Sequence, residues 1–338
     1  MKGLIGVEPA STERLGGGQN SRVYRVDLPG SDRYVAKVYD RFTGRGRGRL
    51  QAEFDGLRFL WDNGERAVPR PVAADYDSAF ALYQYVDGIP VVPSEVTESD
   101  IDQAVAFLLR LKGLAGREGS GRLPPAAEAC FSVREIVQNI RVRRDRLLEL
   151  RGPASHEDLI AFLRDGLNPA LEAVSEWCES TLEGQGLSVD SQVEAGERTL
   201  SPSDFGFHNA VRMAGGEIVF LDFEYFGWDD PAKMVSDFLL HPAMDLSNYL
   251  KRRFFARTTG GYDTLGRLAE RVRTVYPLFG LKWCLIFLNE FAPEHLERRR
   301  FASDGPIDSR EVQSRQLAKA RRMLRRIQNE HQSFPYGD

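Results

Sequence analysis

Short apolar runs separated by turn-forming residues characterise the N-terminal part of the chain. Runs rich in Val and Tyr at Arg22–Val26 and Tyr34–Tyr39 flank a Pro-Gly-Ser-Asp segment and predict a β-hairpin. Apolar residues spaced three or four apart over Leu50–Trp61 predict an amphipathic helix that ends at Asn63-Gly64. The apolar run Ala79–Val86 predicts a further strand. This part of the chain is therefore predicted to be rich in β-structure.

The pattern changes to helical spacing beyond residue 98. One exception is the pair of apolar runs Ala210–Met213 and Glu217–Phe223, which are separated by Ala-Gly-Gly and predict a second hairpin. Apolar residues otherwise recur at intervals of three and four, and the stretches that carry them are 101–109, 132–150, 157–183 and the region after Pro231.

Together these patterns predict an α+β, bilobal protein. We expect a small β-rich N-terminal lobe over 1–86 and a larger helical C-terminal lobe over 87–338. A chain of 338 residues can bury a sizeable core without disulfides or metal ions. A ligand cleft between the lobes is the natural place for chemistry in such an architecture.

The charge balance narrows the possible partners. The formal net charge is −4, which argues against a general nucleic-acid-binding protein, because such proteins are usually basic with a positive face. Arg45, Arg47 and Arg49 form a local Gly-Arg repeat, which is typical of a solvated loop or helix face. We therefore expect no nucleic-acid partner.

Cysteine spacing and hydropathy exclude other classes. Cys130, Cys178 and Cys284 lie far apart and form no Cys-x-x-Cys pair, so neither a zinc site nor a disulfide framework is predicted. No stretch approaches the roughly 18 uninterrupted apolar residues of a membrane span, and the N-terminus lacks the apolar run of a signal peptide. We expect a cytoplasmic protein with no membrane partner.

A glycine-rich turn before the first hairpin suits phosphate binding. Gly17 and Gly18 lack a Cβ, so backbone N–H groups there can approach phosphate oxygens, and Asn20 and Ser21 add side-chain donors. The chain contains no Gly-x-x-x-x-Gly-Lys-Ser/Thr motif, which excludes a P-loop. An ordinary hairpin turn is the alternative interpretation.

A lysine within the next strand suits the same ligand. Lys37 lies in the apolar run Val-Ala-Lys-Val, and a buried ammonium is costly unless it is paired. Glu53, sixteen residues later on the predicted helix, is a plausible partner. The pair would hold the ammonium against the α- and β-phosphates of a nucleotide. The alternative is that Lys37 lies on an exposed strand face.

The third feature is an ordered set of oxygen-bearing side chains. Asp204 and Asn209 lie five apart in a loop, and Asp222 ends the apolar run Ile-Val-Phe-Leu-Asp-Phe. Phosphoryl transfer needs a carboxylate that accepts the hydroxyl proton and oxygen ligands for a metal ion. Asp204 fits the first need, and Asn209 and Asp222 fit the second. Taken singly, Asp204 suits an Asx-turn or helix cap and Asn209 a turn.

Two neighbours of this set have open roles. Glu224 lies two residues beyond Asp222 and would point to the same side of an extended chain. It is either a metal or acceptor contact or a surface or salt-bridge carboxylate. His208, just before Asn209, is interpreted as a packed or exposed loop histidine rather than a substrate contact.

The order of these motifs along the chain resembles that of the protein-kinase-like fold. The motifs are the glycine-rich turn, the strand lysine, the helix glutamate, Asp-x-x-x-x-Asn and Asp-Phe-Glu. The closest resemblance is to the aminoglycoside phosphotransferase and choline kinase superfamily. It spans about residues 12–240 and is most specific over 201–231. It implies Asp204 as catalytic base and Asn209 and Asp222 as Mg²⁺ ligands.

The resemblance also implies that the backbone of Gln84, Tyr85 and Val86 hydrogen-bonds a purine. The expected enzyme is an ATP-dependent, Mg²⁺-dependent kinase of a small-molecule hydroxyl acceptor, such as an amino sugar, a sugar or an amino alcohol. One position departs from the family, because Pro202 replaces its loop histidine. That departure motivates the alternative, a nucleotide-binding pseudokinase that acts as a regulator or scaffold. A protein kinase is disfavoured, since no Ala-Pro-Glu element follows Asp222.

Overall fold

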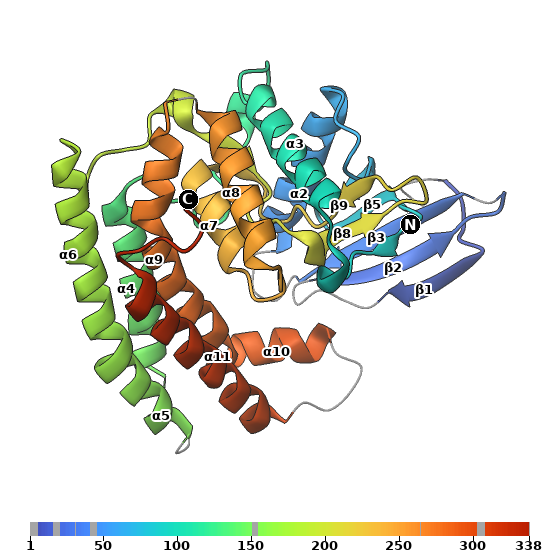
Figure 1. Cartoon of the computed structure of the whole chain (residues 1–338). Helices are drawn as coiled ribbons and strands as arrows, with labels where there is room; N and C mark the ends of the chain where they lie inside the picture. Colours follow the sequence, from blue (N-terminus) through green and yellow to red (C-terminus); the bar gives the residue numbers. More distant parts are fainter. Residues whose placement is uncertain are drawn as a thin grey trace. The chain divides into compact units, whose positions relative to one another are not determined.

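The structure is a computed structural model that describes residues 6–15, 21–30, 32–40, 46–150, 155–263, 265–302 and 308–337. The chain forms two compact units. The first contains residues 1–127, 200–228 and 297–306, and the second contains 128–199, 229–296 and 307–338. A small antiparallel sheet near the N-terminus precedes a largely helical remainder, so the predicted α+β class is confirmed (Figure 1).

The first unit contains a five-stranded antiparallel sheet of order β1-β2-β3-β5-β4 (Figure 1). The predicted hairpin is its β2–β3 pair, in which Val26 lies opposite Tyr34. Val26, Ala36 and Leu82 form a buried cluster on one face of the sheet. The strands are β1 Ser11–Leu15, β2 Ser21–Asp27, β3 Arg33–Tyr39, β4 Pro71–Asp75 and β5 Phe80–Gln84.

Helix α2, Gly46–Asp62, is the predicted amphipathic helix and packs against this sheet. It buries Leu50, Phe54, Leu57 and Leu60, which share one face because they recur every three or four residues. The helix begins at Gly46, where an added Cβ would lie 2.1 Å from the backbone oxygen of Asp40. Only glycine fits that approach.

A second layer of the first unit carries the other predicted hairpin. β8 and β9 pair with Val211 opposite Val219, and β6 extends them to a three-stranded sheet. Helix α3 is capped by Thr97, and its Phe107 stacks on Phe220 of β9 with ring centroids 4.8 Å apart. The elements are β6 Ile89–Pro90, η1 Pro93–Glu95, α3 Glu98–Leu114, η2 Ser120–Arg122, β7 Thr199–Ser201, η5 Phe207–Asn209, β8 Ala210–Arg212, β9 Ile218–Phe220 and β10 Gly227–Asp229, which pairs with β7.

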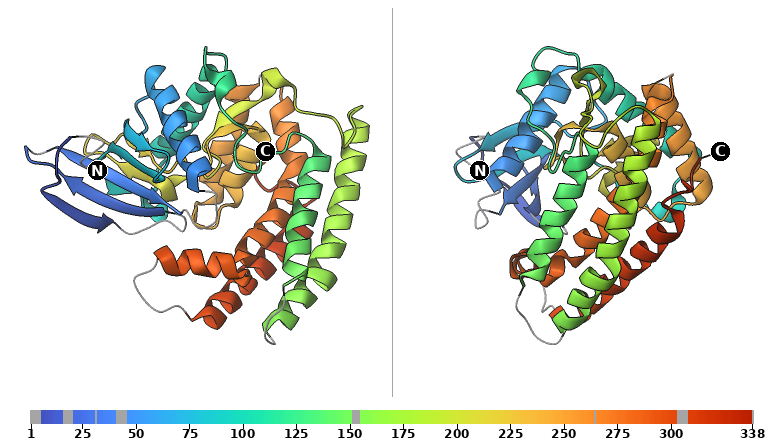
Figure 2. Two further views of the ribbon diagram at one scale, coloured as in Figure 1. Left: turned by 180° about the vertical axis from the view of Figure 1, so that it is seen from behind. Right: turned by 90° about the vertical axis from the view of Figure 1, so that its left-hand side faces the viewer.

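The second unit is built around α9, Arg267–Phe287, which is buried along most of its length. The views agree in placing α4, α6 and α11 alongside it (Figures 1 and 2). At Gly280 an added Cβ would lie 2.2 Å from Ile327 Cδ1, so this glycine lets α11 approach closely. The other elements are α4 Val133–Leu148, α5 Ser155–Ala161, a π-helical turn Phe162–Leu167, α6 Asn168–Gly184, η4 Ala195–Glu197, α7 Pro231–Leu240, α8 Asn248–Tyr262, η6 Leu288–Phe291, α10 Pro293–Ala302, which extends into the first unit, and α11 Ser309–Glu330.

Within the described ranges, no helix has both the length and the apolar character needed to cross a membrane. Cys130, Cys178 and Cys284 are free thiols in the interior, and burial raises the pKa of Cys130 to about 11. The functional division into lobes 1–86 and 87–338 stays a prediction.

Candidate active site

The loop between β7 and β8 presents Asp204 and Asn209 from a fixed backbone. Phe205 and Phe207 are buried, and Phe205 stacks on Phe107 of α3 with centroids 5.8 Å apart. Ser203 has φ of +66°, a left-handed conformation that non-glycine residues adopt mainly where surrounding structure enforces it. The aromatic residues anchor the loop, and the polar residues on either side of them stay partly exposed.

Local hydrogen bonds brace this loop around Pro202. The Ser203 N–H donates to Ser201 Oγ at 3.0 Å, and the Asp204 N–H donates to the Pro202 carbonyl at 2.9 Å. Ser201 and Pro202 are both buried. The loop around Pro202 is therefore held by its own backbone and by Ser201.

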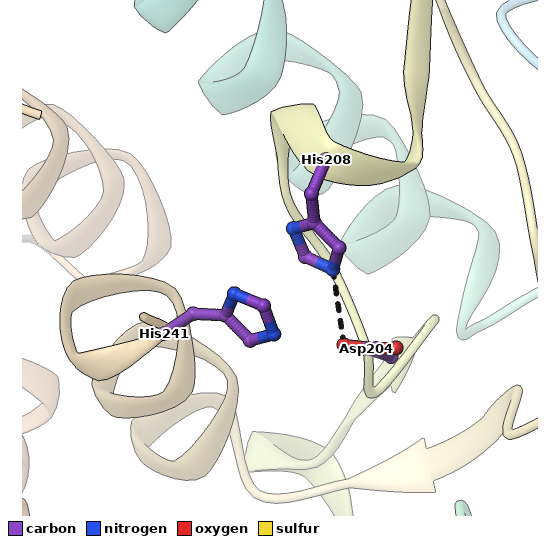
Figure 3. A group of neighbouring side chains, drawn as sticks. All are labelled: Asp204, His208 and His241. Atoms are coloured by element: carbon purple, nitrogen blue, oxygen red, sulfur yellow. Dashed lines mark hydrogen bonds and ion pairs between the residues drawn. The ribbon is translucent and has the colours of Figure 1, made fainter. Parts of the chain in front are cut away.

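Asp204 has two side-chain partners within the loop. His208 Nε2 lies 3.2 Å from Asp204 Oδ1 in a hydrogen bond (Figure 3). Asn209 Nδ2 donates to the Asp204 carbonyl at 3.0 Å and to its Oδ2 at 3.4 Å. His208 is therefore a half-buried loop histidine that contacts the candidate base, and whether it also contacts substrate stays a prediction. Its spacing of four residues from the candidate base was the available signal.

The second acidic motif lies beside this loop. The Leu221 N–H donates to the Asn209 carbonyl at 2.7 Å, which ties the two segments together. Asp222 follows with φ of +64°. Aspartate tolerates this left-handed conformation better than most residues, and such strained positions cluster at functional sites. The hairpin thus sets Asp222 next to the loop that carries Asn209.

Lys37 lies opposite Asp222 and is buried on β3. Its Nζ donates to Glu53 Oε1 at 2.8 Å, to Glu53 Oε2 at 2.9 Å and to Asp222 Oδ1 at 2.8 Å. Burial opposes the charged form, but the carboxylates of Asp222 and Glu53 outweigh it and raise the pKa of Lys37. The side chain is therefore a permanent ammonium, and it does not lie on an exposed face.

One tyrosine that the sequence interpretation missed holds Glu53, and a second contacts the first. Tyr39 OH donates to Glu53 Oε2 at 2.6 Å and lies 2.8 Å from Tyr83 OH. The Phe223 N–H donates to Glu53 Oε1 at 3.3 Å. Tyr39 is two residues beyond Lys37 on β3, so both side chains lie on the same face of the strand. That alternation was the signal that could have identified Tyr39.

Glu224 and Arg49 are buried rather than exposed. Burial, with the charge of Asp222, raises the pKa of Glu224 to about 7, although the cations Lys37 and Arg49 oppose the shift. The surface alternative for Glu224 is therefore wrong. The solvated-face interpretation of the Gly-Arg repeat holds for the exposed Arg47 and fails for Arg49.

The remaining predicted nucleotide contacts are placed only in part. Gly17, Gly18 and Asn20 lie outside the described residues. Ser21 is buried at the start of β2, opposite Tyr39. The backbone N–H of Gln84 donates to Arg70 O at 2.8 Å and that of Tyr85 to Arg33 O at 3.3 Å, so a purine would need the other backbone groups of Gln84, Tyr85 and Val86.

The fold and this set of residues, all of which belong to the first unit, define a protein-kinase-like phosphotransferase. A family model described as the phosphotransferase enzyme family matches residues 11–270. The chain belongs to the phosphotransferase enzyme family, which confirms the predicted class of enzyme. No match was found among curated proteins.

Several solved structures share the fold. A complex of gentamicin with APH(2″)-IIa is 18% identical, with a TM-score of 0.61, over 96% of this chain and 94% of that chain. Choline kinase LicA from Streptococcus pneumoniae is 16% identical, with a TM-score of 0.57, over 94% of each chain. Spectinomycin phosphotransferase APH(9)-Ia, in complex with ADP and spectinomycin, is 12% identical, with a TM-score of 0.58, over 93% and 95%. These likenesses confirm the predicted protein-kinase-like fold.

Proposed function

We propose that the protein transfers the γ-phosphoryl group of ATP to a hydroxyl of a small molecule. The observation that supports this most is the buried Lys37 ammonium, held by Glu53 and by Asp222 beside the Asp204–Asn209 loop. Such an arrangement suits phosphate oxygens on one side and a hydroxyl nucleophile on the other. An amino sugar, a sugar or an amino alcohol is the class of acceptor to test.

Asp222 and Asn209 would hold Mg²⁺. Carboxylate and amide oxygens are ligands that this ion prefers, and the Asn209 amide nitrogen is turned to Asp204, which leaves its oxygen for another partner. Bound Mg²⁺ would neutralise charge on the β- and γ-phosphates. Glu224 is a candidate for a further contact at this end of the site.

Asp204 would act as the base. The acceptor oxygen attacks the γ-phosphorus, the bond from that phosphorus to the β,γ-bridging oxygen breaks, ADP leaves, and Asp204 takes the hydroxyl proton. His208 and Asn209 orient the carboxylate through their hydrogen bonds. Lys37 uses its three N–H bonds on Glu53 and Asp222, so we expect the bond to Asp222 to be exchanged for a phosphate oxygen.

The test is the variant Asp204→Ala, assayed for ADP release with Mg-ATP and a panel of amino sugars, sugars and amino alcohols. We expect turnover to fall about 100- to 10,000-fold, because proton removal is lost, with nucleotide affinity nearly unchanged. Turnover near the wild-type rate would defeat the assignment. Nucleotide binding by the wild type without acceptor-dependent ADP release would favour the pseudokinase alternative.

A further inference from the structure

Arg49 is a buried cation that the proposed mechanism leaves without a role. It lies on α2 one turn before Glu53, so the two side chains share a helix face. The residue is 8% exposed, and its guanidinium carbon lies 5.5 Å from the centroid of the Tyr225 ring. Arg49 thus faces the segment that continues from Asp222.

Its guanidinium has an unused donor. Arg49 Nη1 is buried, and no hydrogen-bond partner for it exists among the residues that the structure describes. Burying a charged donor without a partner is costly, and native structures rarely leave one in that state without a ligand. Glu224 balances the charge from nearby, but it leaves this nitrogen unoccupied.

The surroundings point to an anion at the reacting end of the site. The Tyr225 phenol lies within electrostatic range of Arg49, Asp204 and Asp222. Lys37 is already shared between two carboxylates, so it brings little uncompensated positive charge to an incoming nucleotide. A guanidinium presents a planar fork of donors that matches phosphate oxygens.

We propose that Arg49 is a nucleotide-binding residue whose free guanidinium nitrogen donates to an oxygen of the γ-phosphate of ATP. This assignment rests on the proposed function, because it needs ATP in the site. The γ-phosphate is the matching group, since the phenol that Arg49 faces interacts electrostatically with Asp204, the proposed base for the hydroxyl that attacks the γ-phosphorus.

The experiment compares two nucleotides that differ in this phosphate. Binding of Mg-ADP and of the Mg complex of the β,γ-imido analogue of ATP is measured by titration calorimetry on the full chain. For Arg49→Gln we expect affinity for the ATP analogue to fall about 10- to 100-fold, the loss typical of one hydrogen bond between charged groups. Affinity for ADP should change by less than about threefold.

Arg47→Gln is the matched control, because Arg47 is exposed two residues earlier on the same helix. It should leave both affinities unchanged. Equal losses for the two nucleotides, or no loss, in Arg49→Gln would overturn the inference and leave Arg49 as a structural counter-ion of Glu224. A wild type that binds neither nucleotide would instead defeat the proposed function.

Arg49→Lys covers the case in which Arg49→Gln does not fold, as judged by thermal unfolding. Lysine keeps the charge and loses the fork, so the ratio of ATP-analogue affinity to ADP affinity should fall about threefold or more. An unchanged ratio in a folded Arg49→Lys variant would overturn the inference by itself.

Discussion

Two buried lysines, one in each compact unit, are neutralised in different ways. Lys37 contacts Glu53, sixteen residues away, and Asp222, 185 residues away, each at 2.8 Å. Lys233 contacts two aspartates that each lie four positions away, Asp229 at 2.7 Å and Asp237 at 3.4 Å. The first arrangement needs three separate elements, whereas the second forms at the start of one helix.

The aspartates that pair with the two lysines also differ in their exposure and backbone conformation. Asp222 is 31% exposed and has a left-handed backbone, so it can meet a ligand from solvent. Asp229 is fully buried, and burial raises its pKa to about 6 even though Lys233 opposes the shift. A buried pair that is distant in sequence, strained and open on one side is typical of a site, while a local and closed pair is typical of a core.

The strongest test replaces both lysines by the same residue. Lys37→Met should lower phosphotransfer at least about 100-fold, because the phosphates lose the cation that β3 supplies in the proposed complex. Its free energy of unfolding should change less than that of Lys233→Met, since Asp222 reaches solvent and Glu53 keeps the Tyr39 donor. ADP release measures the turnover, and unfolding in urea measures the stability of the two variants. Unimpaired turnover would remove Lys37 from the site.

Lys233→Met should show the opposite profile. It leaves Asp229 buried without its cation, which should lower the free energy of unfolding by about 3 kcal/mol. Turnover per folded molecule, measured at a temperature where the variant is folded, should stay close to wild type. If turnover fell while stability held, Lys233 would belong to a functional site and the distinction between the two lysines would be wrong.

Residue type and order made part of this site predictable. Asp204, Asn209 and Asp222 could be proposed together because loop and hairpin signals lie close in sequence, and Lys37 with Glu53 because a buried lysine demands a partner. Arg49 could not, since a Gly-Arg repeat looks solvated until α2 is docked on Tyr225. The hydrogen bond from Tyr39 to Glu53 likewise depends on how β3 and α2 pack.

The secondary-structure elements that were predicted correctly have strong local periodicity, and those that were missed lack such a signal. Both hairpins and the helix over Leu50–Trp61 were predicted because alternation and three-four spacing are strong there. The π-helical turn Phe162–Leu167 was not, because a shift from i+4 to i+5 hydrogen bonds leaves apolar spacing nearly unchanged. Boundaries that depend on packing were outside the reach of sequence patterns.

A third buried lysine extends the comparison to pH. Lys282 Nζ lies 3.0 Å from Glu128 Oε2, and Arg143 also pairs with Glu128. Although burial opposes ionisation, Lys282 and Arg143 lower the pKa of Glu128 to about 2. The stabilisation is therefore complete above about pH 4.5, the ordinary value, and is lost as pH falls toward 2.

Because the Glu128 side chain is 38% exposed, water screens the pair and the contribution should be about 1–2 kcal/mol. The free energy of unfolding in urea should be measured between pH 3 and 6. For Glu128→Gln it should approach the wild-type value near pH 3 and lie below the wild-type value near pH 6. Glu172→Gln, an exposed substitution on α6, is the control and should track wild type throughout. Parallel curves for Glu128→Gln and wild type would show that the pair adds no stability.

The smallest expected effect tests what holds the Lys37 arrangement in place. Tyr39→Phe removes the hydroxyl that donates to Glu53 at 2.6 Å and keeps the ring. Losing one hydrogen bond to a buried carboxylate should lower turnover about three- to tenfold, because Glu53 is then held less firmly. Tyr83→Phe should lower turnover less, because the Tyr83 hydroxyl contacts Tyr39 rather than Glu53. ADP release for the two variants under identical conditions gives this order. If Tyr83→Phe had the larger effect, Glu53 would be positioned from β5 rather than from the strand that carries Lys37.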